Sequence, residues 1–153
     1  MHRDFDEFLK LLNSHKIKYV IVGGYALSIY AIPRATKDMD ILIEASEDNA
    51  SKMIKALDGF GFKSSNLQTE DFLNPETIIQ LGRAPVRIDL ITSITGVKWD
   101  EIWKNKTKGT FGNSNIPVYF IGKAQLIKNK SATGRDQDLL DVKKLKKTKK
   151  KGG

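Results

Sequence analysis

A pair of glycines followed by an Asp-x-Asp strand constrains the fold of this chain more than any other feature. The β-rich run 18–22 stops at Gly23 and Gly24, and thirteen residues separate these glycines from Asp38 and Asp40. Absent side chains allow close backbone approach where a strand enters a helix. Side chains alternate along a strand, so both carboxylates would point to one face, with Cα atoms about 7 Å apart. The sequence therefore predicts a strand, a tight turn, a helix and a second strand with two acids on one side.

A third acid lies in a similar apolar run. Asp89 belongs to a predicted strand over residues 86–92, between Ile88 and Leu90. Three carboxylates from two strands can hold two Mg²⁺ ions, one on a triphosphate and one that lowers the pKa of an attacking hydroxyl. The third carboxylate can also accept the hydroxyl proton. With the phosphate-favouring N–H groups of a helix start, the pattern indicates metal-assisted phosphoryl or nucleotidyl transfer.

The alternative is that Asp38 and Asp40 end an amphipathic edge strand and that Asp89 is a surface residue. Apolar residues flank each acid closely. Burial of carboxylates among them without a cation would be costly, which favours the metal-binding interpretation.

The order of the expected elements predicts the fold class. Helices are expected over residues 4–14, 25–31, 123–130 and 135–147, with one more between the N-cap Ser46 and Gly59. Strands are expected over residues 18–22, 38–44, 60–64, 77–81, 86–92 and 116–121. Because several strands follow one another directly, we expect an α+β fold with a mixed β-sheet and helices packed on one side. A doubly wound sheet would need a crossover helix between each strand pair.

The length of 153 residues fits one domain over residues 1–142, followed by a basic and disordered tail over residues 143–153. Residues 143–151 hold seven lysines and no acids, so most of the formal charge of +8 lies there. Such a run can attract RNA or DNA phosphates through counterion release. The competing interpretation is a solvated helix end, whose lysines interact with the C-terminal dipole.

Several classes of protein are disfavoured by the composition. The absence of cysteine excludes disulfides and thiolate metal sites. No apolar run approaches the roughly 18 residues that span a membrane, and the N-terminus is polar and acidic, unlike a signal peptide. We therefore expect a cytoplasmic location and no membrane partner.

The glycine pair and the three acids together resemble the DNA polymerase β-like nucleotidyltransferase superfamily. The signature of that superfamily is Gly-Gly or Gly-Ser after an apolar residue, then Asp-x-Asp, then a third acid on a later strand. The resemblance covers residues 18–92, and residues 22–40 look like the small bacterial AbiEii-like branch. That branch includes toxins of toxin–antitoxin pairs that modify tRNA, and enzymes that adenylylate aminoglycosides or lincosamides. A weaker match, to a Lys…Arg-x-x-Asp-x-x-Asp element, covers residues 130–141.

The resemblance implies roles for particular residues. It implies Mg²⁺ ligands and catalytic groups at Asp38, Asp40 and Asp89. It implies nucleotide contacts at Gly23, Gly24, Arg34, Lys37 and Lys130. Relatives with Gly-Ser place a serine hydroxyl on a phosphate, whereas Gly24 offers only its backbone N–H.

The function implied is a Mg²⁺-dependent nucleotidyltransferase that moves a nucleoside monophosphate from an NTP to an acceptor hydroxyl and releases pyrophosphate. The acceptor is an RNA such as tRNA, a protein or a small molecule, and a cognate antitoxin protein is a further possible partner. One rival is an inactive member that serves as a nucleotide-sensing or partner-binding module. Another is an RNA-binding protein that acts through its lysine tail alone.

Three further groups of residues keep two interpretations each. Residues 135–141 form either an intrahelical salt-bridge set or part of the site. Trp99 and Trp103 are either a packing pair or a base-stacking platform. Tyr25 contacts either the nucleotide base or the core.

Overall fold

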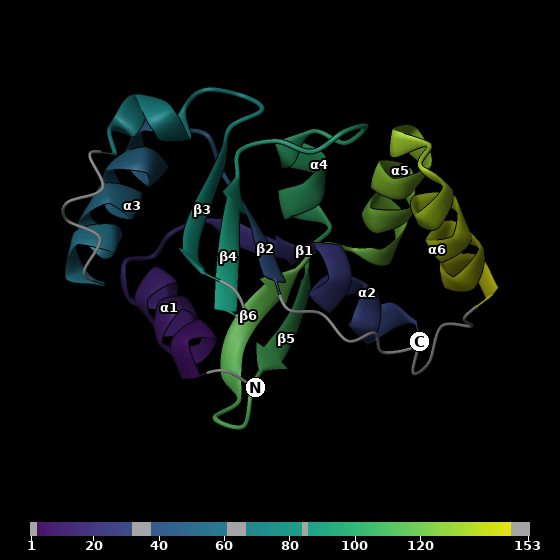
Figure 1. The fold of residues 1–153 in the computed structure, drawn as a ribbon, viewed down its shortest axis with the longest axis horizontal. Coiled ribbons are helices and arrows are strands. Elements are labelled where there is room, and N and C mark those ends of the chain that lie inside the picture. Colours follow the sequence, from purple (N-terminus) through teal and green to yellow (C-terminus); the bar gives the residue numbers. More distant parts are fainter. Residues whose placement is uncertain (1–2, 32–37, 61–66, 84–85, 148–153) are drawn as a thin grey trace.

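The fold was analysed in a computed structural model that describes residues 3–31, 38–60, 67–83 and 86–147 (Figure 1). The predicted contacts at Arg34 and Lys37 lie outside the described residues. So do most of the strand expected over 60–64 and the end of the basic tail.

A six-stranded mixed sheet forms the centre of the molecule, in the order β3-β4-β2-β1-β6-β5. The strands are β1 (Tyr19–Val22), β2 (Asp38–Ile43), β3 (Ile78–Arg83), β4 (Val86–Ile91), β5 (Thr107–Phe111) and β6 (Ile116–Phe120). Strand β2 runs antiparallel to β1 and parallel to β4, and β1 runs parallel to β6. The predicted α+β class with a mixed sheet is confirmed.

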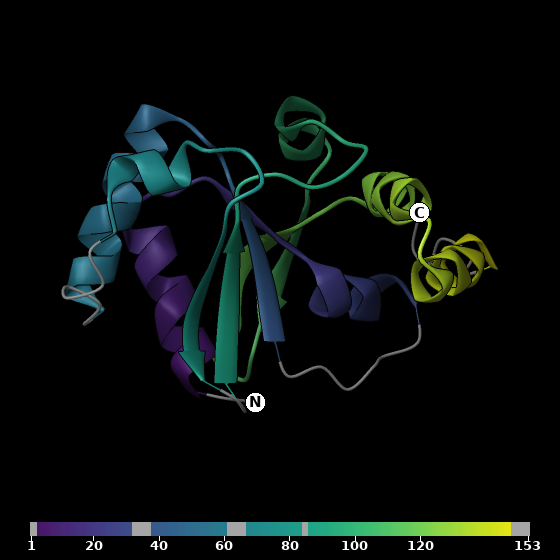
Figure 2. The same ribbon diagram turned by 45° about the horizontal axis from the view of Figure 1, so that its top comes forward.

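The helices lie on both sides of this sheet. They are α1 (Arg3–Ser14), α2 (Gly23–Tyr30), α3 (Glu47–Gly59), α4 (Trp99–Lys104), α5 (Lys123–Thr133) and α6 (Asp136–Lys147), with a short 3-10 turn η2 (Thr69–Phe72). Figure 2 shows α1 and α3 together on one side, and α2, α5 and α6 on the other. The one-sided helical layer of the prediction thus corresponds to α1 and α3. The other side of the sheet carries α2, α5 and α6, and α2 contacts both β1 and β2.

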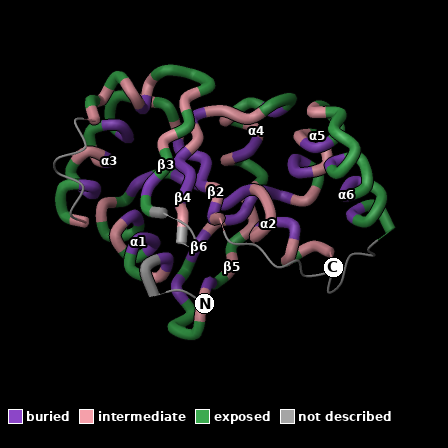
Figure 3. The backbone as a smooth tube through the Cα atoms, in the orientation of Figure 1, coloured by how far each residue is buried: buried purple, intermediate pink, exposed green. Residues whose placement is uncertain are grey.

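The core forms where α1 and α3 cover the sheet, and it appears as the buried segments of Figure 3. Helix α1 contributes fully buried side chains at helical spacing: Phe5, Phe8, Leu9 and Leu12. Met39 and Ile41 of β2 are also fully buried. Burial of each such side chain stabilises the fold by about 1.5–3 kcal/mol. Among the described residues, no helix is long and apolar enough to cross a membrane.

The start of α3 is fixed by the cap that the sequence predicts. Ser46 Oγ accepts a hydrogen bond from the backbone N–H of Asn49 at 3.2 Å. The buried Asn49 side chain in turn accepts from the Lys18 N–H at 2.8 Å and donates to the Glu44 carbonyl at 2.9 Å. These bonds tie α3 to the start of β1 and the end of β2, so the carboxylate strand is held firmly at its far end.

Candidate active site

Strand register gathers four charged side chains on one face of the sheet. In the parallel pair β2–β4, Asp38 lies opposite Arg87 and Asp40 lies opposite Asp89. Residues directly opposite each other on paired strands point to the same face. The intervening residues, such as Met39, point to the other face and are buried in the core. The structure therefore brings together the three acids that the sequence singles out.

Arg87 is a fourth member of this group that sequence reasoning missed. Its Nη2 donates to Asp38 Oδ2 at 2.7 Å, and its Nε donates to Asp89 Oδ1 at 3.1 Å. The hydrogen bond to Asp89, together with the charges of Asp89, Asp38 and Asp40, raises the pKa of Arg87. The signal in the sequence is the spacing of two between Arg87 and Asp89, which puts both on one face of a strand. The link to Asp38 follows only once β2 and β4 are known to pair.

Asp40 lies in the most electrostatically strained position of the face. Burial, followed by the negative charges of Asp89 and Asp38, raises the pKa of Asp40 to about 6. The positive charges of Arg87 and Lys130 act in the opposite direction. Burial and the two neighbouring carboxylates together therefore outweigh the cations, and the ionised form of Asp40 is disfavoured.

Helix α2 begins directly against Asp40. Gly23 adopts φ +70°, and a Cβ at this position would overlap Asp40 Oδ2. Only glycine combines this left-handed backbone with so close an approach. Val22, the N-cap of α2, provides no side-chain hydrogen bond to the first N–H groups of the helix. The glycine pair is thus the first turn of α2 itself, rather than a turn that precedes the helix.

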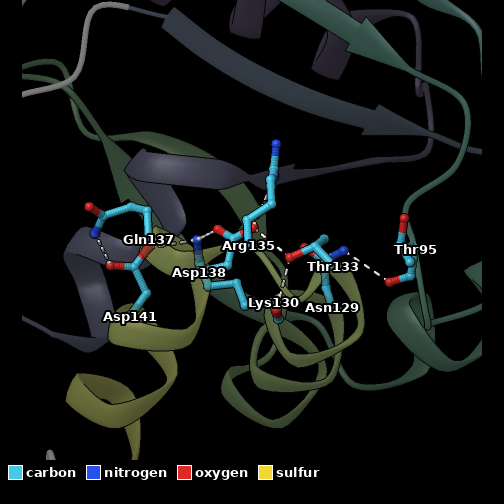
Figure 4. A network of polar contacts seen from close by, with 8 residues as sticks. All are labelled: Thr95, Asn129, Lys130, Thr133, Arg135, Gln137, Asp138 and Asp141. Atoms are coloured by element: carbon cyan, nitrogen blue, oxygen red, sulfur yellow. Dashed lines mark hydrogen bonds and ion pairs between the residues drawn. The ribbon is translucent and has the colours of Figure 1, made fainter.

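Lys130 is the centre of a buried ion network between α5 and α6 (Figure 4). Its Nζ lies 2.9 Å from Asp141 Oδ2 and 3.2 Å from Asp138 Oδ1, and all three residues are buried. Thr133 Oγ1 and Arg135 Nε both donate to Asp138 Oδ2. Burial raises the pKa of Asp138, but these bonds and Lys130 outweigh it, so its pKa lies below the usual value.

The network bears on both interpretations of residues 135–141, the salt-bridge set and the part of the site. It is a salt-bridge set that holds the α5–α6 hairpin, whose turn is Gly134 in the left-handed conformation. Helix α6 also packs against α2. The Lys130 charge is near enough to Asp40 to lower the pKa of that carboxyl. Lys130 is therefore a structural ion, bound to Asp138 and Asp141, whose positive charge also acts on Asp40.

The aromatic residues singled out in the sequence pack against protein. Tyr25 makes edge contacts with Phe5 and Phe111, at centroid distances of 5.9 and 5.5 Å. Burial and the charge of Asp38 raise the pKa of Tyr25, so its hydroxyl end lies toward the acidic face. Trp99 and Trp103 stack at 5.4 Å, which confirms the packing pair.

The acidic face has the donor chemistry of a divalent cation site, although a guanidinium now bridges two of its acids. Carboxylate oxygens are the ligands that Mg²⁺ prefers. Burial, and then the charges of Asp89 and Asp38, raise the pKa of Asp40, and a cation bound beside this carboxylate would favour its ionised form. Across the described ranges, no three His, Cys, Asp or Glu side chains are gathered closely enough to form a ready-made metal cluster. The residues fit Mg²⁺ on condition that Arg87 moves.

The mixed sheet, with its acidic face and a helix that begins at a glycine pair, has the DNA polymerase β-like fold that nucleotidyltransferase structures share. The chain belongs to a nucleotidyltransferase family of unknown function, DUF6036, whose family model matches residues 3–149. No curated protein sequence matches the chain significantly.

Solved structures share this fold at low sequence identity. A Thermotoga maritima protein, provisionally assigned as a nucleotidyltransferase, aligns with TM-score 0.58 and 17% identity over 93% of this chain and 89% of its own. The lincosamide antibiotic adenylyltransferase LnuA, with lincomycin bound, aligns with TM-score 0.56 and 14% identity over 97% of this chain and 98% of its own. An antigenic nucleotidyltransferase-like protein from Paracoccidioides brasiliensis aligns with TM-score 0.51 and 16% identity over 90% of this chain and 69% of its own.

Proposed function

We propose that this protein is a Mg²⁺-dependent enzyme that transfers a nucleoside monophosphate from an NTP to an acceptor hydroxyl. The observation that carries the proposal is the register of β2 and β4, which aligns Asp40 with Asp89 on the face that also carries Asp38. Membership of a nucleotidyltransferase family supports the same class of reaction. The acceptor oxygen would bond to the α-phosphorus, and the bond to the β-phosphate oxygen would break, so that pyrophosphate leaves.

The proposal gives all three acids to the metal and a second role to one of them. Asp38 and Asp40 would hold Mg²⁺, with Asp89 as the third ligand. Bound there, Mg²⁺ would neutralise triphosphate charge and lower the pKa of the acceptor hydroxyl. Asp89 also accepts the acceptor proton, because its side chain is largely buried on the same face and adjoins Asp40.

The nucleotide contacts come from three parts of the chain. Gly23 and Gly24 offer uncapped N–H groups at the start of α2, which suit the β- and γ-phosphates. Lys130 adds a positive charge from the α5–α6 hairpin. Arg34 and Lys37 remain candidates for the phosphates or the acceptor.

The acceptor is an RNA, a protein or a small molecule. The lysine run at the end of the chain favours RNA, and tRNA modification of the AbiEii-like kind, with an antitoxin partner in the cytoplasm, is one form of the proposal. A small molecule is the other form, since LnuA is described as a lincosamide adenylyltransferase and aligns over nearly the whole of both chains.

One observation favours the rival, a nucleotide-binding module without activity. Arg87 engages Asp38 and Asp89, the two acids that flank Asp40 in space. A member whose acids are neutralised internally could bind nucleotide without transfer.

The decisive experiment is transfer of label from each α-³²P NTP, with Mg²⁺ or Mn²⁺, to total RNA, lysate protein or lincomycin. We expect Asp38→Asn and Asp89→Asn to reduce transfer at least about a hundredfold, since metal coordination is worth several kcal/mol. Asp48→Asn is the matched control, because Asp48 is an exposed acid of α3 that pairs with Lys52. Label transferred equally by wild type and Asp38→Asn would contradict the proposal. NTP binding by the folded wild type without transfer to any acceptor would favour the rival.

A further inference from the structure

Arg87 occupies the place of a cation on the acidic face. Its guanidinium reaches Asp38 at 2.7 Å and contacts both oxygens of Asp89, at 3.1 and 3.3 Å. A guanidinium keeps its charge at any physiological pH, so it cannot give up a proton to make room for Mg²⁺. Two cations cannot share these oxygens without strong repulsion. A metal ion that binds Asp38 Oδ2 and the two Asp89 oxygens must therefore replace the guanidinium there.

The structure makes separation easier from Asp38 than from Asp89. The side chains of Arg87 and Asp38 are 35% and 39% exposed, so water can replace each partner as that pair separates, whereas the Asp89 side chain is 13% exposed. Partly exposed ion pairs contribute little to stability, which makes them exchangeable. On the side away from Asp38, the residue opposite Arg87 is Gly82 of β3. The residue across from Arg87 on that side therefore presents no side chain to the guanidinium.

We propose that Arg87 is a built-in counter-cation that a divalent ion displaces from Asp38 and Asp89, and that the freed guanidinium then binds the triphosphate. This inference rests on the proposed function, because it assumes a divalent ion on these acids. The exchange conserves charge: as the metal takes over the carboxylates, the nucleotide brings phosphate oxygens that suit the planar, multiple-donor guanidinium. Arg87 thus holds the acidic face together before substrate arrives and contacts substrate afterwards.

The proposal predicts opposite effects of one substitution on two ligands. Arg87→Met keeps an unbranched side chain that ends near the position of Nε, and it removes the charge. Mn²⁺ alone, followed by electron paramagnetic resonance of the free ion, should bind about three- to fivefold more tightly to Arg87→Met, because an exposed ion pair no longer competes. Magnesium tripolyphosphate, followed by calorimetry, should bind about tenfold more weakly, because a charge-assisted hydrogen bond is lost. A purely structural role would weaken both ligands together.

Two controls separate this exchange from general charge effects. Lys128→Met removes the cation of a comparably exposed pair, 2.9 Å from Glu101, and should change neither affinity. Arg87→Lys retains the charge and should stay closer to wild type than Arg87→Met for both ligands. A change of the same sign for Mn²⁺ and magnesium tripolyphosphate in Arg87→Met would overturn the proposal.

A measurement on the wild type covers the case in which Arg87→Met does not fold. With ¹⁵N-labelled arginine, the Nε–H resonance of Arg87, assigned by its loss in Arg87→Lys, should shift as Mg²⁺ saturates the protein. An unchanged resonance at saturation, with binding that depends on Asp38, would overturn the exchange and leave the proposed function standing. A wild type that binds no divalent ion, with or without tripolyphosphate, would overturn both.

Discussion

At the scale of single residues, Asp40 stores unfavourable electrostatic energy that a cation would release. Its folded-state pKa of about 6 lies above the ordinary unfolded value of about 3.9. Folding therefore favours the protonated carboxyl. The destabilisation is absent below pH about 4, grows as the pH rises, and is complete above pH about 6.

The stability of Asp40→Asn tests this directly. Without divalent ions, we expect the variant to unfold with about 1–2 kcal/mol more free energy than wild type at pH 8, a value reduced because Asp40 is only partly buried. Urea unfolding at several pH values measures it, and the difference should vanish near pH 4. Asp48→Asn, on the surface of α3, should show no such gain. A variant less stable than wild type at pH 8 would show that Asp40 is not under strain.

The role of Gly23 can be tested by comparison with Gly134. Gly134 has nearly the same φ, +69° against +70°, but nothing lies within 4 Å of a Cβ built there. Gly134→Ala should therefore cost only the backbone strain, about 1 kcal/mol. Gly23→Ala adds an overlap with Asp40, and overpacking costs about 1–3 kcal/mol more. Equal costs in urea unfolding would mean that α2 does not press on Asp40.

At the scale of elements, the α5–α6 hairpin is held by charge on its inner side. Helix α6 buries Asp138 and Asp141, whereas Leu139 and Leu140 are 42% and 51% exposed. The same inner side also buries Val142 and Leu145, so it combines acids with apolar residues, while two leucines face outward. The inward acids are satisfied because Lys130 lies between them.

Lys130→Met should therefore be severe. It would leave two buried carboxylates without their cation, and removal of one partner from a buried pair costs about 3–5 kcal/mol. The loss should be largest near neutral pH and shrink in acid, because the variant lacks the lysine that helps to hold down the pKa of Asp138, so that this carboxyl can take up a proton. Urea unfolding at pH 4 and pH 7 would measure it, with Lys128→Met, two residues earlier in α5 and exposed, as the control. Equal loss at both pH values would contradict an ionic origin.

At the scale of the whole molecule, local patterns predict most of the sheet. The runs that became β1, β2, β3, β4 and β6 are β-rich or apolar, and Ser46 marks the start of α3 as expected. Strand β5 was missed because Lys108 and Thr110 are exposed and Gly109 reads as a break. In the structure Gly109 leaves room for the ring of Phe120, at 2.9 Å from a Cβ built there. Helix α4 was missed because six residues with one buried side chain carry little periodicity.

For the site, strand periodicity predicts only which residues of one strand share a face. Asp38 and Asp40 share a face whatever their neighbours, and so do Arg87 and Asp89. The pairing of β2 with β4 joins residues 49 positions apart, and nothing local specifies it. The hydrogen bond from Arg87 to Asp38 is therefore a property of the assembled sheet. The burial of Lys130 likewise depends on how α6 folds back on α5.

The alternation of charged and apolar residues along β2 also disfavours incorrect pairing of the strands. Along β2, charged residues alternate with Met39 and Ile41, which are fully buried. A slip of one residue in pairing would exchange the two faces. Asp38 and Asp40 would then enter the apolar core between the sheet and helices α1 and α3. Burial of carboxylates there without partners is strongly unfavourable. The carboxylates of Asp38 and Asp40 therefore also disfavour a shifted pairing of β2 while the sheet forms.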